Sequence, residues 1–230
     1  MIVYVLCPDD AAVKTARDLY TEPEFKCICL PNEENPFLES FVFSDILLDR
    51  KEEWIHHDFV GTISHSACTK QPLVTRLPEI VDIATQKGCD AVTLMYRGDP
   101  LLRTAEKWHP GFCETWKVVC ERLGFRESEY MRDDLLSFYC NYFLVAPRIM
   151  ESYCRMLSAL KVWMRLDTLL LHQFMKDSHY DDRGPEIAKI SDDKKKKLFG
   201  VAHYPMGVFV CERLPCLILP QLSGKMLHIR

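Results

Sequence analysis

One amide interrupts an apolar stretch in the second half of the chain. Asn141 lies within residues 137–147, whose other members are mostly aromatic, aliphatic or sulfur-containing. Burying an amide without partners costs about 1–3 kcal/mol, because its hydrogen bonds to water are lost. Asn141 is therefore expected either to be locked in a hydrogen-bond network or to face a ligand. An aromatic wall beside it could come from Tyr142, Phe143 or Trp108.

A pair of charged residues interrupts a second apolar stretch, residues 208–217. These are Glu212 and Arg213. Ionised groups are expensive to bury unless they pair, so a structural ion pair is one interpretation. The alternative is a ligand site, with Glu212 as a catalytic carboxylate and Arg213 among the acceptor-binding residues with Asn141 and Tyr142. His203 precedes this stretch and is a candidate phosphate or metal contact, although a single histidine is more often structural.

Arg97 and Asp99 follow an apolar run at residues 91–96. A carboxylate at the end of a strand can hold a divalent metal ion that bridges two phosphates, and an adjacent guanidinium can pair with phosphate oxygens. Asp99 and His203 are therefore the candidate metal ligands, and Arg97 is a candidate phosphate contact. The alternative for Asp99 is a turn that caps the next helix, because aspartate is a good helix cap.

Two adjacent carboxylates, Asp133 and Asp134, precede the segment that contains Asn141. They could orient a sugar hydroxyl or act as a base, and a solvated loop is the alternative. Cys7 and Asp9 lie where the first apolar run of the chain ends. They are candidate donor-binding residues, because ligands of parallel α/β sheets lie beyond the carboxyl ends of the strands.

The elements that would position these side chains alternate between strand and helix patterns. This alternation predicts a single α/β domain with a mostly parallel central sheet flanked by helices. Residues 178–197 are rich in charge and poor in apolar side chains, which is typical of a flexible segment. The expected strands are 2–7, 26–30, 59–64, 91–96 and 137–145. The expected helices are 11–20, 39–49, 73–87, 112–123 and 148–175, and two interpretations of the last stretch, one helix or two, stay open.

Composition narrows the class of protein. A chain of 230 residues can bury the core of one domain. The net charge of -4 argues against non-specific nucleic-acid binding, and the basic run at residues 194–197 is expected to be a solvated helix face. The 11 cysteines lack a CxxC spacing and indicate buried thiols in a reducing compartment. Without a signal-peptide pattern or a stretch long enough to span a membrane, we expect a cytoplasmic protein.

Several common nucleotide-binding and catalytic motifs do not occur. The sequence has no GxGxxG, no P-loop and no nucleophile elbow, which disfavours the commonest dinucleotide-binding, kinase and hydrolase classes. A methyltransferase would usually carry a glycine-rich loop after its first strand, whereas residues 7–10 here read Cys-Pro-Asp-Asp.

A series of short segments, in one order across most of the chain, resembles GT-A-type glycosyltransferases of large DNA viruses (chlorella-virus-like) and bacterial polysaccharide loci. The segments are Asn35-Pro36-Phe37-Leu38-Glu39-Ser40, Trp54, residues 59–64 with Lys70 after them, His109-Pro110-Gly111-Phe112, Trp116, Leu123-Gly124, Cys140-Asn141-Tyr142-Phe143, Pro205, Phe209 and Glu212-Arg213-Leu214-Pro215. The resemblance implies a GT-A-like (Rossmann-like) domain. It also implies transfer of a hexosyl or deoxyhexosyl unit from a nucleotide sugar, most often a UDP-sugar, to a glycan acceptor.

The sequence departs from this family at the metal site. GT-A enzymes commonly bind the donor diphosphate through Mn²⁺ or Mg²⁺ held by an Asp-x-Asp pair, and no Asp-x-Asp occurs here. Asp99 could supply one such carboxylate. The expected organisation places the nucleotide sugar in residues 1–100 and the acceptor in residues 101–230. Two alternatives stay open: a non-catalytic carbohydrate- or protein-binding module on the same fold, and a nucleotidyltransferase.

Overall fold

The computed structural model describes residues 1–138, 141–183 and 190–229. Within these residues a central six-stranded sheet has the order β2-β1-β3-β7-β4-β8. Strand β7 is antiparallel to both of its neighbours, and the other adjacent pairs are parallel. The predicted α/β class with a mostly parallel sheet is therefore confirmed. The strands are β1 (Ile2–Cys7), β2 (Phe25–Cys29), β3 (Val60–Ser64), β4 (Ala91–Thr93), β7 (Phe143–Val145) and β8 (Met226–His228).

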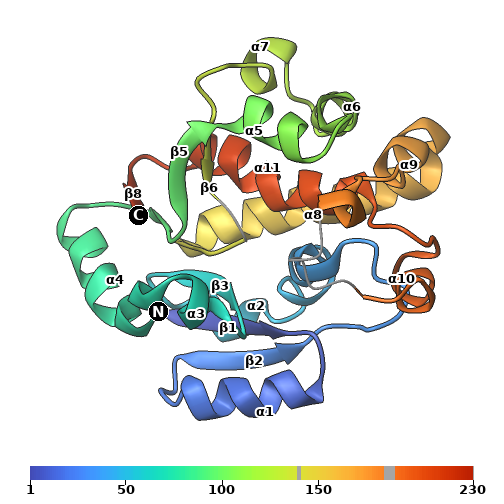
Figure 1. Ribbon diagram of the computed structural model, residues 1–230. Coiled ribbons are helices and arrows are strands. Elements are labelled where there is room, and N and C mark those ends of the chain that lie inside the picture. The colour runs from blue at the N-terminus through green and yellow to red at the C-terminus, as the bar shows by residue number, and fades with distance from the viewer. Residues whose placement is uncertain (139–140, 184–189, 230) are drawn as a thin grey trace.

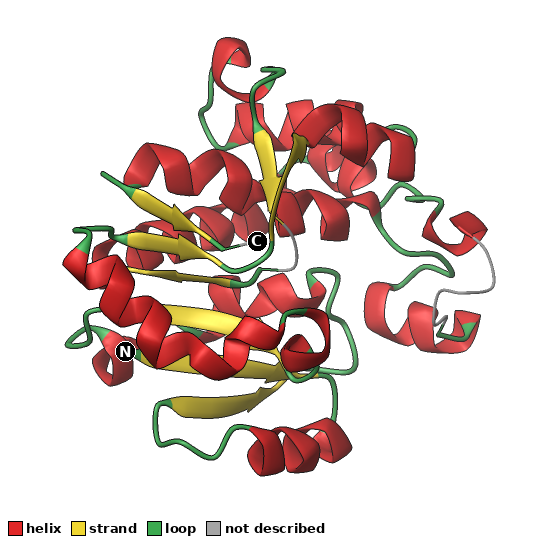
Figure 2. Cartoon of the chain, turned by 60° about the vertical axis from the view of Figure 1, so that its left-hand side comes forward, coloured by secondary structure: helices red, strands yellow, loops and turns green. Residues whose placement is uncertain are grey.

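Helices cover both faces of this sheet (Figures 1 and 2). Strand β1 is buried along its whole length, and its side chains alternate between the faces. Tyr4 and Leu6 join the larger core with α6 (Phe112–Arg122), α8 (Pro147–Leu166) and α11 (Met206–Leu222). Val3 and Val5 join the core of the opposite face, with α1 (Asp10–Leu19), α3 (Ala67–Lys70) and α4 (Leu77–Gln86).

A second, two-stranded sheet stands apart from the central one. It pairs β5 (Tyr96–Pro100) with β6 (Leu136–Phe138), and Figure 1 shows both strands rising away from β3 towards α5 (Leu101–Trp108) and α7 (Glu127–Tyr130). The predicted strand 91–96 is therefore wrong in extent, because β4 ends at Thr93. The pairing of β5 is irregular around Gly98, whose φ of 73° suits glycine.

The predicted continuous strand 137–145 is wrong. It divides into β6 and β7, which belong to different sheets, and Asn141 lies in the turn before β7. Its φ of 47° is left-handed, a conformation that asparagine tolerates better than most residues. Asn141 is thus not in the middle of a strand, and Cys140, which was expected to share that strand, lies outside the described residues.

The remaining helical segments are shorter than the sequence pattern predicted. Residues 39–49 form a 3₁₀ turn, η1 (Leu38–Ser40), and a π-helical turn, η2 (Val42–Ile46), followed by α2 (Lys51–Trp54). Residues 73–87 divide into η3 (Pro72–Arg76) and α4. Of the two interpretations of residues 148–175, the structure has the one with two helices, because Asp167 ends α8 and caps α9 (Thr168–Phe174). Among the described residues, no helix combines the length and apolar character of a membrane span.

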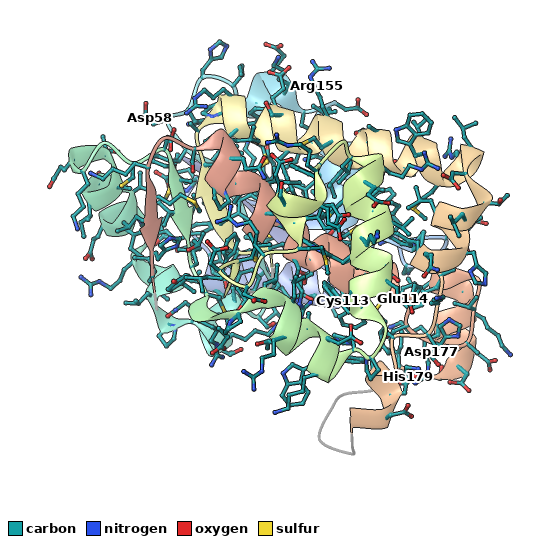
Figure 3. All side chains as sticks on the ribbon, turned by 90° about the horizontal axis from the view of Figure 1, so that it is seen from above. Asp58, Cys113, Glu114, Arg155, Asp177 and His179 are labelled. Carbon is teal, nitrogen blue, oxygen red and sulfur yellow. The ribbon has the colours of Figure 1, made fainter. Side chains whose placement is uncertain are left out.

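The segment beyond α9 contains a buried lysine. It comprises η4 (Tyr180–Arg183) and α10 (Asp192–Phe199). Figure 3 shows Asp177 and His179, which lead from α9 into this segment, close to Cys113 and Glu114 of α6. Most of the lysine run 194–197 is solvated as predicted, but Lys195 is only 4% exposed. Its Nζ lies 2.5 Å from Asp181 Oδ2 and 2.8 Å from Asp192 Oδ1, so it ties η4 to α10.

Replacing Lys195 by methionine should destabilise the fold by about 1–3 kcal/mol, between the values typical of exposed and buried ion pairs. The reason is that the ion pairs of the buried Lys195 with Asp181 and Asp192 would be lost. Urea denaturation of K195M and of K194M, which changes an exposed neighbour, measures the difference. Equal midpoints for the two variants would contradict a stabilising role for Lys195.

Candidate functional site

A cleft lies beyond the carboxyl ends of the strands and comprises two neighbouring cavities, whose linings share Tyr180, Phe209 and Glu212. Pro8 after β1, Leu30 after β2 and Met95 after β4 all reach it, as expected for a ligand site of an α/β sheet. The arginine compartment, of about 450 Å³, is lined by Met95, Arg97, Asp99, Thr104, Trp108, His109, Tyr180, Phe209, Glu212 and Arg213. The glutamate compartment, of about 320 Å³, is lined by Pro8, Leu30, Phe37, Leu38, Glu39, Ser40, Asn141, Tyr180, Tyr204, Val208, Phe209 and Glu212.

Two elements bring the guanidinium groups to the arginine compartment. Strand β5 presents Arg97 and Asp99, both exposed to solvent at the cleft. Helix α11 presents Arg213, which is 5% exposed. The Nη1 atom of Arg213 donates to the carbonyl of Phe209 (3.0 Å) and lies 3.3 Å from Glu212 Oε2. The pair Glu212–Arg213 is therefore both the ion pair and the cavity lining that the sequence offered as alternatives.

Stacked aromatic rings form the wall between the compartments. The imidazole of His109 stacks on Phe209 with 3.8 Å between centroids, and Tyr180 stacks on the same ring at 5.1 Å. Tyr204 meets Tyr180 edge-on at 4.9 Å. The Nδ1–H of His109 donates to the carbonyl of Ser178 (3.2 Å), and this hydrogen bond fixes the orientation of the imidazole ring. An apolar wall of this kind is suited to the face of a sugar ring or a base.

Asn141 faces the glutamate compartment. Its Nδ2 donates to Ser40 Oγ (3.3 Å), and its backbone carbonyl accepts from Thr62 Oγ1 (2.6 Å). Its Oδ1 is buried, and no group of the described residues donates to it. Because a buried acceptor without a donor is costly, Oδ1 is suited to receive a hydrogen bond from a ligand. Asn141 thus has both of its expected roles, in a network and at the cavity.

A strained turn holds Glu39 at the same cavity. Leu38, the residue before it, has a φ of 47°, a conformation that costs about 1–3 kcal/mol in a residue with a branched side chain. Asn35 stabilises the turn, since its Nδ2 donates to the carbonyls of Pro31 and Leu38, each at 3.3 Å. Strain maintained by a buried hydrogen-bond network is typical of functional sites.

Glu39 and Glu212 place two carboxyl groups at one cavity. Glu39 is half-buried, and desolvation of its carboxyl group at the cavity, together with the negative charge of Glu212, raises its pKa to about 7, whereas the cation of Lys70 opposes this rise. Glu212 has the ion pair with Arg213, whereas Glu39 forms no hydrogen bond or salt bridge through its carboxyl group within the described residues. A carboxyl group that titrates near neutral pH in a cavity is a candidate acid or base.

Three predicted residues lie close to the cleft without lining it. Cys7 ends β1, and burial raises the pKa of its thiol to about 12, which disfavours the thiolate. Asp9 caps α1, with Oδ1 accepting from the amide of Ala12 (2.8 Å). Tyr142 is buried; its hydroxyl is hydrogen-bonded to Ser64 and lies 3.4 Å from Lys70 Nζ.

Asp133 and Asp134 are not brought to the cleft. Asp134 forms two hydrogen bonds with Arg132, at 2.7 and 2.6 Å, and these hold the pKa of its carboxyl below the usual range. Asp134 lines a separate cavity of about 290 Å³ with Tyr96 of β5 and Leu136 of β6, and Asp133 is exposed in the adjoining turn. Of the three aromatic candidates, only Trp108 lines the cleft, because Tyr142 and Phe143 are buried in the core.

The candidate metal ligands do not come together either. His203 lines neither compartment, and its Nε2–H donates to the carbonyl of Met175 (2.9 Å). Across the described ranges, no three His, Cys, Asp or Glu side chains form a metal-binding group. Asp99 does not cap α5, since Pro100 occupies the cap position and no side chain caps that helix. The capping alternative for Asp99 is therefore wrong.

Glu39 is a carboxylate of the cleft lining that was not predicted as a site residue, and His109 and Tyr180 were not predicted either. Glu39 follows Asn-Pro-Phe-Leu in a segment that carries part of the family resemblance. It is next to the polar Ser40, so it does not interrupt an apolar run and the sequence pattern does not single it out. Comparisons of the chain with family models, with curated proteins and with solved structures find no match. The case for a function therefore rests on the geometry and charge of the cleft.

Proposed function

We propose that this protein is a GT-A-type glycosyltransferase that moves a sugar from a nucleotide sugar, with a UDP-sugar the first candidate, to a hydroxyl group of a glycan. One observation carries the proposal. At the carboxyl ends of the strands, a compartment lined by two arginines lies beside a compartment lined by two glutamates and a buried amide, and the two share an aromatic wall. Such a cleft matches the two ends of a sugar diphosphate.

The arginine compartment is suited to the diphosphate. Arg97 and Arg213 present guanidinium groups that can form paired hydrogen bonds with phosphate oxygens. In the transition state the bond between the sugar and the diphosphate breaks, and negative charge grows on the leaving oxygen. A buried cation such as Arg213 stabilises that charge more strongly than water does, because its surroundings are already ordered.

The glutamate compartment is suited to the transferred sugar. Asn141 Oδ1 can accept a hydrogen bond from a hydroxyl group of the transferred sugar, and the carboxyl groups of Glu39 and Glu212 lie at the same cavity. Phe37, Tyr204 and Val208 offer apolar surface to the carbon face of the ring. Glu212 lines both compartments, so it lies next to the anomeric carbon in this arrangement and can stabilise the positive charge that develops there.

Within the described residues, the predicted metal ligands do not form a set at the arginine compartment. Asp99 is the one predicted metal ligand that lines the arginine compartment, and His203 does not join it. The neutralisation of the diphosphate is therefore assigned to Arg97 and Arg213, with no step through a metal ion. The predicted division into a donor half and an acceptor half stays a prediction, and both compartments draw residues from both halves.

The first test is donor binding. Calorimetry with UDP-, GDP- and dTDP-hexoses should find a donor whose affinity is unchanged by manganese and by Asp99→Asn. Arg97→Gln should weaken that donor by about 10- to 100-fold, the usual value of a hydrogen bond to a charged group. Arg103→Gln, which changes an exposed arginine of the neighbouring helix α5, is the matched control and should bind normally. No binding of any donor at millimolar concentration would end the proposal.

A non-catalytic carbohydrate-binding module is the second candidate, and the missing Asp-x-Asp pair favours it. Such a module would bind free glycans in the glutamate compartment and would release no nucleoside diphosphate from any donor. A nucleotidyltransferase would instead join a sugar phosphate to a nucleoside triphosphate, and the triphosphate would release pyrophosphate. The released product, which is a nucleoside diphosphate, pyrophosphate or neither, therefore distinguishes the three candidate functions.

A further inference from the structure

The two carboxyl groups of the glutamate compartment have different partners. Glu212 lies beside the buried guanidinium of Arg213 and forms an ion pair with it, with 3.3 Å between Oε2 and Nη1. Glu39 lines the same cavity from η1, and among the described residues its carboxyl group forms no ion pair. Asn35 and Asn141 fix the turn around it through the carbonyl of Leu38 and the hydroxyl of Ser40. The structure thus holds an unpaired carboxyl group at a defined place.

We propose that Glu39 is the general base of sugar transfer, a role that rests on the proposed function. As the acceptor oxygen attacks the anomeric carbon, its proton passes to a carboxylate oxygen of Glu39. The bond between the anomeric carbon and the diphosphate oxygen breaks, and its electron pair leaves with the diphosphate. The products are the glycosylated acceptor, the nucleoside diphosphate and a protonated Glu39, which returns the proton to solvent.

The other carboxylates of the candidate set are less suited to this role. Asp99 lines the arginine compartment and not the glutamate compartment. Asp134 is held by Arg132 at a separate cavity. Glu212 is engaged by the guanidinium of Arg213 in an ion pair. Glu39 lines the sugar compartment, and within the described residues its carboxyl group forms no ion pair.

The charges around Glu39 tune it for proton transfer. Glu212 on α11 contributes a negative charge, Lys70 after β3 contributes a positive one, and Tyr180 and Tyr204 are the titratable neutral groups that line the same cavity. Burial and Glu212 outweigh Lys70, so the pKa of Glu39 rises to about 7. A base with this pKa is mostly ionised just above neutral pH and still takes up a proton effectively.

The decisive experiment uses the donor found by calorimetry and follows release of its nucleoside diphosphate, with water as the acceptor. Glu39→Gln should bind the donor within threefold of the wild type and should release nucleoside diphosphate at least about 100-fold more slowly, the usual contribution of a general base. The wild-type rate should rise with pH through about 7. Lys70→Gln should move this rise to higher pH, because a positive charge that favours ionised Glu39 is removed.

The outcomes separate this inference from the proposed function. If wild type and Glu39→Gln bind the donor equally and release its nucleoside diphosphate at equal rates, Glu39 is not the base, whereas the transferase proposal stands. If the wild type binds no donor, both fall. A titration of ¹³C-labelled glutamate carboxyl groups, assigned with Glu39→Gln, needs no substrate at all. A Glu39 signal that titrates near the ordinary value of 4.5 would overturn the inference even if hydrolysis is too slow to follow.

Discussion

Glu212→Gln is expected to slow sugar transfer by about 100- to 1,000-fold, the effect seen when one preorganised electrostatic group is removed from a transition state. Glu212 lines both compartments of the cleft, at the place where the anomeric carbon and the leaving diphosphate would meet. Its negative charge is most valuable when the sugar carries partial positive charge, and glutamine has the same size without that charge. Donor affinity should therefore change much less than the rate.

The same substitution gives a second readout with a definite sign. The negative charge of Glu212 favours the protonated form of Glu39, so its removal should lower the pKa of Glu39. The rise of the residual rate with pH should then occur below pH 7, opposite to the change expected for Lys70→Gln. Glu212→Asp, which keeps the charge, should retain more activity than Glu212→Gln. Equal rates and unchanged pH profiles for Glu212→Gln and wild type would contradict this assignment.

Most strands of the central sheet, though not β8, and the position of the cleft could be predicted from the sequence because their signals are local. The β-branched run at Ile2–Cys7 is buried on both faces and forms β1 with the expected ends. Residues that follow β1 and β4, such as Pro8 and Met95, reach the cleft because carboxyl ends of parallel strands share one edge. Glu212 and Arg213 were found because charge in an apolar run is unusual, and that signal does not depend on whether the run is a strand or a helix.

The rest depends on backbone conformation and on contacts between distant segments. The apolar pattern of residues 137–145 gives no sign that the chain turns at Asn141, because a left-handed residue changes neither composition nor periodicity. Glu39 approaches Glu212 only when η1 packs beside α11, and nothing local to either residue records that contact. The partner of Asp134, in contrast, is local in the sequence. Arg132 lies two residues before it, and the two side chains form an ion pair.

Glu39→Gln is expected to stabilise the fold at pH 8 by up to about 3 kcal/mol and to leave it nearly unchanged below pH 4.5. Burial raises the pKa of Glu39 from 4.5 to about 7 in the folded chain. Below 4.5 both folded and unfolded chains are protonated at this group, so the wild type incurs no penalty. Between 4.5 and 7 the unfolded chain loses the proton first, and the free energy of unfolding of the wild type falls.

Glutamine carries no proton to lose, so the advantage of Glu39→Gln should grow through this window and stay constant above it. Urea denaturation of both proteins at several pH values between 4 and 8 measures the difference directly. Glu34→Gln, a change at an exposed glutamate of the same loop, should show no such divergence. Parallel stability curves for wild type and Glu39→Gln would mean that ionised Glu39 is already well solvated. A variant that is more stable yet slower would instead show that the cleft keeps an unfavourably buried carboxylate because its chemistry requires one.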